Sequence, residues 1–282
     1  MHRWCEARLG RSWGRPQQDL GRHAPTQRGG RRYLRVVVSR GFAAHVALGA
    51  AAALGLSILA TSGIGTPVAG PPARSAPTGP PPDVVVVGES LVHQVAPLET
   101  ALLREAGYRP AVVARDSEDL SSTFVQQQVR EAVDEGTPIV VLETASNDAY
   151  HGAGTAPRDA WEPALVRYRQ TLDATLGHLS HQCTVLVDTR VDATSDWYGL
   201  RRIGPGIDDA LAQEARAHRG SVVLVRWSSL SAGHGSDWFW TDGLHFGDPD
   251  HGNRDWHAAG ATAFADAIAS GVESCAALLR NG

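Results

Sequence analysis

The stretch "VVVVGESLVHQ", residues 84–94, sets four valines against an abrupt Gly-Glu-Ser. Valine favours strands because its branched side chain packs well on a pleated surface. Beyond the serine, the apolar residues of 92–106 recur every three or four positions, which is the period of an amphipathic helix. The pattern predicts a strand over 84–88, a helix over 92–106, and Ser90 at the junction between them.

The same alternation of strand and helix recurs along the rest of the chain. Further strands are predicted over 109–115, 138–144, 183–189 and 221–227, and further helices over 122–136, 156–179, 206–220 and 258–272. Repeated strand–helix units build a mostly parallel sheet with helices on both faces. In such an α/β fold, reactive side chains are expected at the carboxyl ends of the strands.

The region before this domain indicates where the protein is located in the cell and not which reaction it catalyses. Residues 42–60 are almost continuously apolar and follow several arginines, as in a secretory signal or a signal anchor. Cleavage and retention in the membrane both remain open, and either route predicts an extracytoplasmic protein. We divide the chain into an arginine-rich leader (1–40), a signal peptide or anchor (41–63), a proline-rich linker (64–82) and one domain (83–282).

The distribution of charge argues against nucleic acid as a partner. The chain has a net charge of −4, and ten of its arginines lie in the first forty residues. The domain is therefore more acidic than the whole chain. Binding of phosphate backbones needs clustered positive charge, which the domain lacks.

Ser90 has two interpretations when it is considered alone. Serine is a common N-cap residue, so Ser90 could simply begin the helix. It could also be a nucleophile, which requires an adjacent base and a third group that orients this base. The segment "WFWTDGLHF" offers both, because two residues separate Asp242 from His245. In a tight turn after a strand, this spacing lets the carboxylate accept a hydrogen bond from one ring nitrogen while the other nitrogen faces Ser90.

Asn147 completes the set of polar residues at the expected rim. It follows the third predicted strand within "VLETASNDAY". An asparagine amide and the backbone N–H of Ser90 can both donate to an oxyanion. Each motif has an ordinary alternative, in turns or caps, but a parallel sheet would bring all three together.

In order and spacing, these blocks resemble the SGNH hydrolases, the GDSL esterase and lipase superfamily. Gly88-Glu89-Ser90-Leu91, Ser146-Asn147-Asp148 and Asp242-Gly243-Leu244-His245 correspond to three of its motifs, over residues 83–272. The resemblance implies a flavodoxin-like three-layer α/β/α sandwich with a five-stranded parallel sheet. It also implies Ser90 as nucleophile, His245 as base, Asp242 as orienter and Asn147 as oxyanion donor, acting on ester or acetyl groups with neither metal nor cofactor.

One block departs from the family pattern. After the second strand the family usually has a glycine whose N–H completes the oxyanion hole, whereas this chain reads "ARDSEDLSS". We predict the backbone N–H of Ser117 as the donor there, with Asp116 as the alternative. The neighbouring carboxylates of Asp116, Glu118 and Asp119 could oppose a developing negative charge. This departure favours a rival interpretation, a non-catalytic glycan-binding module.

Smaller signals complete the expectations. Cys183 and Cys275 form an even pair within an exported domain, which predicts a disulfide, with two buried thiols as the alternative. The polar segment 248–257 does not fit a calcium-loop pattern and is interpreted as a solvated loop. Trp238 and Trp240 are interpreted as core and rim packing rather than as a wall of the substrate site.

We therefore predict a monomeric, exported serine esterase. Its substrate would be a small ester, a lipid or a polysaccharide ester, including O-acetyl groups. An acyltransferase using the same triad remains an alternative, because a sugar hydroxyl could replace water in the second step. A flavin or nucleotide binder is disfavoured because the first strand is followed by only one glycine.

Overall fold

The computed structural model describes residues 80–153, 157–193, 199–248, 252 and 254–281. The predicted leader, signal segment and most of the linker lie outside the described residues. The described part begins three residues before the position predicted for the start of the domain. Its strands are β1 Val84–Gly88, β2 Pro110–Ala114, β3 Ile139–Glu143, β4 Cys183–Val187 and β5 Val222–Val225.

The helices alternate with these strands along the chain, as the apolar periodicity predicted. They are α1 Ser90–Glu105, α2 Thr123–Asp134, α3 Ala145–Ala153, the 3₁₀ turn η1 Arg158–Ala160, α4 Trp161–His178, α5 Gly204–Ala217, α6 Trp227–Leu230 and α7 Ala258–Asn281.

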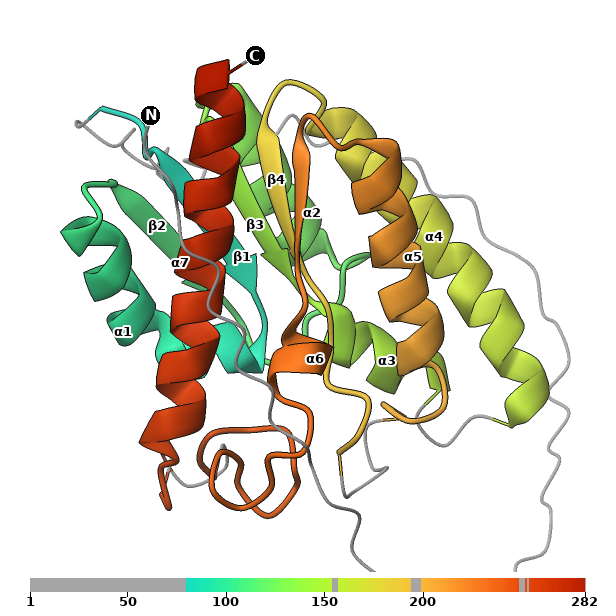
Figure 1. Ribbon diagram of the computed structural model, residues 1–282. Coiled ribbons are helices and arrows are strands. Elements are labelled where there is room, and N and C mark those ends of the chain that lie inside the picture. The colour runs from blue at the N-terminus through green and yellow to red at the C-terminus, as the bar shows by residue number, and fades with distance from the viewer. Residues whose placement is uncertain (1–79, 154–156, 194–198, 249–251, 253, 282) are drawn as a thin grey trace, which may run out of the picture. The chain divides into compact units, whose positions relative to one another are not determined.

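All five strands are parallel and form one sheet in the order β2-β1-β3-β4-β5. This is the flavodoxin-like order, so the predicted three-layer fold is confirmed. Helices α1 and α7 cover one face of the sheet, and α2, α4 and α5 cover the other (Figure 1). The strands point downward in Figure 1, so their carboxyl ends face α3, α6 and the long loop that follows α6.

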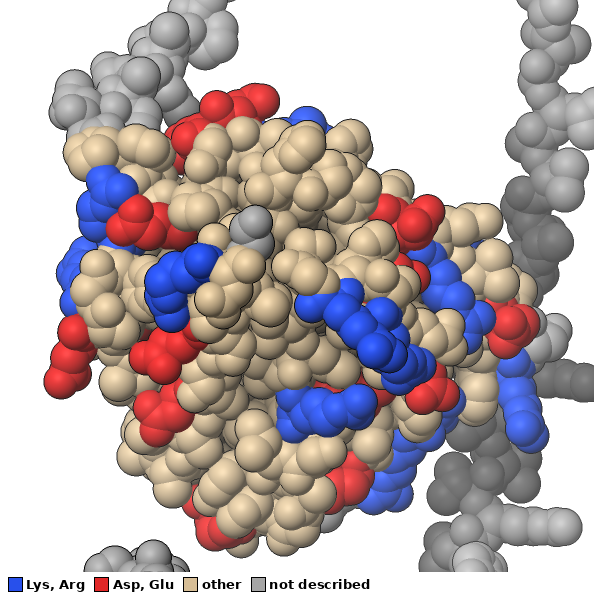
Figure 2. All heavy atoms as spheres, turned by 45° about the horizontal axis from the view of Figure 1, so that its top comes forward, with Lys and Arg blue, Asp and Glu red and all other residues tan. Residues whose placement is uncertain are grey.

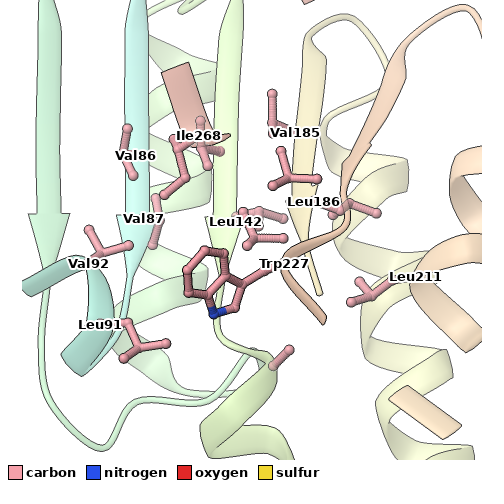
Figure 3. Packing of buried hydrophobic residues seen from close by; sticks show 14 of the residues in the cluster. Val86, Val87, Leu91, Val92, Leu142, Val185, Leu186, Leu211, Trp227 and Ile268 are labelled. Carbon is pink, nitrogen blue, oxygen red and sulfur yellow. The ribbon is translucent and has the colours of Figure 1, made fainter. Parts of the chain in front are cut away.

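The centre of the core is formed by β1, β3 and β4, whose runs of apolar residues are buried on both faces, as expected for a parallel sheet, while the edge strands β2 and β5 are only partly buried. Trp227 is the largest fully buried side chain and lies just beyond β5. Figure 3 shows its indole among Val87, Leu91, Leu142 and Ile268. The tryptophan thus fills the space under the carboxyl rim, directly behind the start of α1.

Two helices were not predicted. Helix α3 begins at Ala145, two residues beyond β3, in a segment for which no helix was predicted. Helix α6 is a single turn of four residues. Neither segment shows a sustained apolar period, since Ser, Asn, Asp and Gly in α3 are typical of turns. The consequence for the site is that Asn147 lies in the first turn of a helix.

Helix α7 is long and apolar enough to span a membrane by length and composition, and it is the single such helix among the residues that the structure describes. Its Phe264, Ile268 and Val272 are nevertheless fully buried against the sheet. Cys275 on the same helix forms a disulfide with Cys183 at the start of β4, with a Cα–Cα distance of 5.6 Å. The predicted disulfide is therefore present, and α7 is a core helix of the domain.

Loss of this disulfide should destabilise the domain. Cys183 and Cys275 are 92 residues apart. In the chain-entropy account, a disulfide that closes a loop of this length stabilises the folded state by at most about 4 to 5 kcal/mol. We expect the C183A/C275A double variant to lose a large part of that free energy of unfolding in urea titrations. A double variant whose unfolding midpoint equals that of the oxidised wild type would contradict this expectation.

Acidic and basic side chains are interspersed over the face of the domain shown in Figure 2, and neither sign forms a broad patch there.

Candidate active site

Ser90 is the first residue of α1, and the residue in the N-cap position is Glu89. The interpretation of Ser90 as a capping residue is therefore not supported. Gly88 explains how the helix can begin so abruptly, because a Cβ at this position would overlap the side chain of Val92 in the first turn. A glycine is needed where helix and strand approach this closely. The Ser90 hydroxyl consequently lies at the carboxyl rim of the sheet, as predicted.

The structure brings the three predicted triad residues together. The Ser90 Oγ lies 2.9 Å from the His245 Nε2, and the His245 Nδ1 lies 2.6 Å from the Asp242 Oδ2. Because a carboxylate can only accept, the proton on the imidazole belongs on Nδ1, which leaves Nε2 free to accept from the serine hydroxyl. This is the tautomer that a general base requires.

Asp242 is fixed by the backbone of its own turn as well as by the histidine. Its Oδ1 accepts hydrogen bonds from the N–H groups of Leu244, at 2.9 Å, and His245, at 3.0 Å. Burial alone would raise the pKa of Asp242, but the hydrogen bonds and charge of His245, together with these N–H groups, hold the pKa below its ordinary value. The carboxylate therefore stays ionised at neutral pH, where it can stabilise an imidazolium.

Aromatic packing holds the loop that carries Asp242 and His245. Phe239 and Phe246 flank this turn on either side, are fully buried, and both meet Trp227 edge to face with ring centroids 6.1 Å apart. Trp238 stacks on Trp227 at 5.9 Å. Burial of several rings supplies much of the free energy that orders an irregular segment. The interpretation of Trp238 as a packing residue is confirmed.

Two residues that the sequence analysis missed also hold this loop. The amide of Gln94 on α1 accepts from the Phe246 N–H at 2.9 Å and donates to the Gly247 carbonyl at 3.1 Å. The buried guanidinium of Arg190, just beyond β4, donates to the Gly243 carbonyl at 2.9 Å and lies 4.0 Å from the centre of the Phe239 ring. Gln94 thereby couples the helix of Ser90 to the loop of His245. The only signal in the sequence was the position of each residue near a predicted carboxyl rim.

The side-chain N–H₂ of Asn147 is a buried hydrogen-bond donor without a described partner. The residue is buried in the first turn of α3, and its Nδ2 has no hydrogen-bond partner among the described residues. Leaving a buried amide unpaired costs about 1 to 3 kcal/mol, so such a group commonly marks a functional position. The predicted role as an oxyanion donor accounts for this orphaned N–H₂.

The loop after β2, where the sequence departs from the family pattern, contains a residue in an unusual backbone conformation. Ser117 has a φ of 62°, the left-handed conformation that glycine adopts readily and other residues adopt rarely. A residue other than glycine held in this conformation is often found at a functional site. Ser117 remains a predicted donor.

The three carboxylates of this loop are paired with potential cations. Asp116 lies 2.7 Å from the His93 Nδ1, Glu118 lies 3.1 Å from the Arg115 guanidinium, and Asp119 lies 2.7 Å from the His151 Nδ1. Burial raises the pKa of Asp119, but the hydrogen bonds of His151 and Ser121 outweigh it and keep the pKa low. The Arg115 guanidinium, which is always charged, offsets part of the negative charge of this loop.

Asp148 ties this loop to α3. Its carboxyl oxygens accept from the Leu120 N–H at 3.2 and 3.4 Å. Burial, with a smaller contribution from the charge of Asp119, raises the pKa of Asp148 to about 8. The helix of Asn147 and the loop of Ser117 are thereby held in a fixed relation.

A cavity of about 510 Å³ lies beside α3 and α4, away from the serine. Most of the residues that line it are polar, including Asp119, Asp148, His151, Arg167, Tyr168 and Thr171.

Within the described ranges, no cluster of three or more His, Cys, Asp or Glu side chains could hold a metal ion. Part of the polar segment 248–257 lies outside those ranges.

Comparisons of the sequence found no matching protein family and no matching curated protein. Solved structures of similar fold include the following three. The catalytic domain of peptidoglycan O-acetyltransferase A from Streptococcus pneumoniae is 17% identical, with a TM-score of 0.47, covering 70% of this chain and 96% of that domain. An acetylxylan esterase from Geobacillus stearothermophilus is 13% identical, with a TM-score of 0.48, covering 66% and 91%.

A protein described as a GDSL-like lipase from Parabacteroides merdae is 14% identical, with a TM-score of 0.44, covering 67% of this chain and 94% of that one. The motifs had predicted this superfamily from the sequence. With strand order 2-1-3-4-5 and its serine, asparagine and histidine blocks at one rim, the described domain resembles the SGNH hydrolases of the GDSL esterase and lipase superfamily.

Proposed function

We propose that the protein is a serine esterase that acts outside the cytoplasm on carboxylic ester bonds, including O-acetyl esters. The observation that carries the proposal is the continuous hydrogen-bonded chain from the Ser90 Oγ through His245 to the Asp242 carboxylate. A serine hydroxyl is a weak nucleophile unless a base is within hydrogen-bonding distance and correctly oriented. Both requirements are met at this rim.

The reaction would follow the two steps of acyl transfer. The Ser90 Oγ attacks the ester carbonyl carbon while the His245 Nε2 takes the hydroxyl proton. The negative charge on the carbonyl oxygen would be stabilised by the N–H of Ser90, the Nδ2 of Asn147 and the N–H of Ser117. Collapse of the intermediate breaks the bond to the alcohol, which leaves with the proton from His245. Water, deprotonated by the same histidine, then releases the acid and regenerates Ser90.

Two features support action outside the cytoplasm. The domain contains the disulfide between Cys183 and Cys275, a bond that persists mainly in oxidising compartments. The apolar stretch 42–60 has the composition of a signal or an anchor. Candidate substrates are a small ester, a lipid and an O-acetylated polysaccharide.

The test is active-site labelling of the full chain with a fluorophosphonate, followed by mapping of the labelled peptide and by assay of p-nitrophenyl acetate hydrolysis. We expect labelling at Ser90 that disappears in the H245A variant and persists in H178A, which changes an exposed histidine on α4. A folded wild-type protein that is neither labelled nor active would refute the proposal and favour the binding-module interpretation. Acetyl transfer to an added glycan in preference to water would identify the acyltransferase.

Removal of the Asn147 amide should lower the rate without changing substrate affinity greatly. In the N147A variant, we expect kcat for p-nitrophenyl acetate to fall about 10²- to 10³-fold, because one oxyanion donor is lost. KM should stay nearly constant, since the interaction forms mainly in the transition state. Because the Nδ2 has no other described partner, the variant should remain as stable as the wild type or become slightly more stable. A kcat within threefold of the wild-type value would exclude Asn147 from the oxyanion site.

A further inference from the structure

Two buried glutamates lie directly behind the candidate nucleophile. Glu89 is 0% exposed and Glu143, the last residue of β3, is 2% exposed. Glutamate is almost never fully buried unless it is paired. The triad chemistry uses neither carboxyl group. Their burial beside Ser90 therefore needs a separate explanation.

The carboxyl group of Glu143, and not that of Glu89, caps the N-terminus of α1. The Glu89 side chain makes no capping hydrogen bond to α1. Instead, the Glu143 Oε2 accepts from the Glu89 N–H at 3.4 Å, and its carboxyl also accepts from the N–H of Val92 in the first turn. A carboxyl group at a helix N-terminus satisfies N–H groups that have no partner within the helix. The N-terminus of α1, including Ser90, is thus attached to the end of β3.

A proton shared between the carboxyl groups of Glu89 and Glu143 allows both groups to be buried together. The Glu89 carboxyl oxygens accept no hydrogen bond from an N–H or hydroxyl group of the described residues. Burial first, and then the charge of Glu143, raise the pKa of Glu89 well above its ordinary value. Burial raises the pKa of Glu143 to about 7, against the opposing effect of its hydrogen bonds with Glu89. The Glu89 N–H contact with the Glu143 Oε2 places both residues at one buried site. Two buried carboxyl groups at one site cannot both ionise cheaply, so a proton on one of them can be donated to the other.

Glu143 is also close to Asn147 along the chain. Helix α3 begins at Ala145, two residues after Glu143, and the Thr144 carbonyl accepts from the Asn147 N–H at 3.1 Å. A displacement of Glu143 would therefore move both Asn147 and the start of α1. These are the two elements that carry the candidate oxyanion donors.

We propose that Glu143 is a positioning residue, which caps α1 through a proton shared with Glu89 and thereby fixes Ser90 relative to Asn147. The inference rests on the proposed function for its catalytic consequence, but the shared proton and the position of Ser90 can be measured without activity. The titratable groups that act on this pair are Glu99 on α1, which has its own pKa raised to about 8 by burial and by Glu143, and Asp148 on α3.

The first test compares two substitutions at one position. In E143A the cap and the proton acceptor are both lost, and we expect kcat for p-nitrophenyl acetate to fall about 10- to 100-fold with KM within threefold of the wild-type value, as for a small misplacement of a nucleophile. In E143Q the amide oxygen can still accept from α1 and the N–H₂ can donate to Glu89, so most of kcat should be restored. E143A with wild-type kcat, or E143Q as impaired as E143A, would overturn the inference.

E99A is the matched control. Glu99 is as buried as Glu89 and its carboxyl oxygens also have no hydrogen-bond partner among the described residues, but it lies farther along α1. E99A should alter the unfolding midpoint and leave kcat within threefold. If kcat fell in both E99A and E143A, and each fall was proportional to that variant's loss of free energy of unfolding, Glu143 would have only a structural role.

The second test needs no catalysis. A carboxyl group whose pKa is raised in the folded state stabilises the protein fully below its unfolded pKa, near 4.5, and loses this contribution as pH rises through about 7. The difference in unfolding midpoint between E143Q and wild type should therefore grow from pH 5 to pH 8 in favour of E143Q. Parallel curves of unfolding midpoint against pH would overturn the shared proton.

Two further outcomes separate the proposals. If wild type hydrolyses no ester, the proposed function fails on its own. An unchanged Ser90–Asn147 separation in crystals of E143A would overturn the positioning role.

Discussion

Replacement of Ser90 by alanine is expected to lower kcat for ester hydrolysis about 10⁶-fold, because the nucleophile and the proton-transfer path through His245 are lost together. The expected change in folding free energy is small, below about 1 kcal/mol. Ser90 occupies the first position of α1 and not its N-cap, so the variant removes no capping bond. Activity and stability should therefore respond very differently to this one substitution.

The contrast between these two readouts decides between the interpretations of Ser90. A capping serine would cost about 0.5 to 2 kcal/mol on replacement by alanine and leave any activity in place. We would measure steady-state hydrolysis of p-nitrophenyl acetate and urea unfolding on the same preparations. The S274A variant, which changes an exposed serine on α7, serves as control. An S90A protein with more than one hundredth of wild-type kcat would mean that another group attacks the ester.

The sequence was most informative where a residue's role depends on its immediate neighbours. Each strand was recognisable because a buried parallel strand is a short run of apolar, β-branched residues. Gly88 and Ser90 could be placed at the rim for the same reason. Asp242 and His245 could be paired because two intervening residues suit a turn, and the turn exists, although it lies within a long loop and not directly after a strand.

Residues whose partners are distant in the sequence could not be identified in advance. Gln94 bonds to the backbone 152 residues away, Arg190 bonds to Gly243, and Glu143 bonds to the N–H of Glu89, 54 residues away. In each case the partner is a backbone group, which carries no residue-specific pattern. Helix α3 was missed for a related reason, since its first turn is fixed by contacts of Asp148 with the loop after β2. Only the folded chain brings these groups together.

Replacement of Asp242 by asparagine should lower kcat about 10⁴-fold while leaving the loop in place. In the D242N variant, the side-chain carbonyl oxygen can still accept from the N–H groups of Leu244 and His245, as the Asp242 Oδ1 does. This orientation points the new N–H₂ at the His245 Nδ1, which must then accept. The ring proton moves to Nε2, so the histidine can no longer take the proton of Ser90.

The same loop contains a matched control for this change. Asp237 pairs with the His234 Nδ1 at 2.8 Å and accepts from the Gly235 N–H, but Asp237 is exposed, His234 is partly exposed, and neither is hydrogen-bonded to Ser90. D237N makes the identical chemical change and should keep kcat within threefold. Fluorophosphonate labelling rates and kcat, measured for D242N, D237N and wild type, would separate the two effects. D242N with more than a tenth of wild-type kcat would show that another group orients His245, because the hydrogen-bonded turn alone cannot supply the correct tautomer.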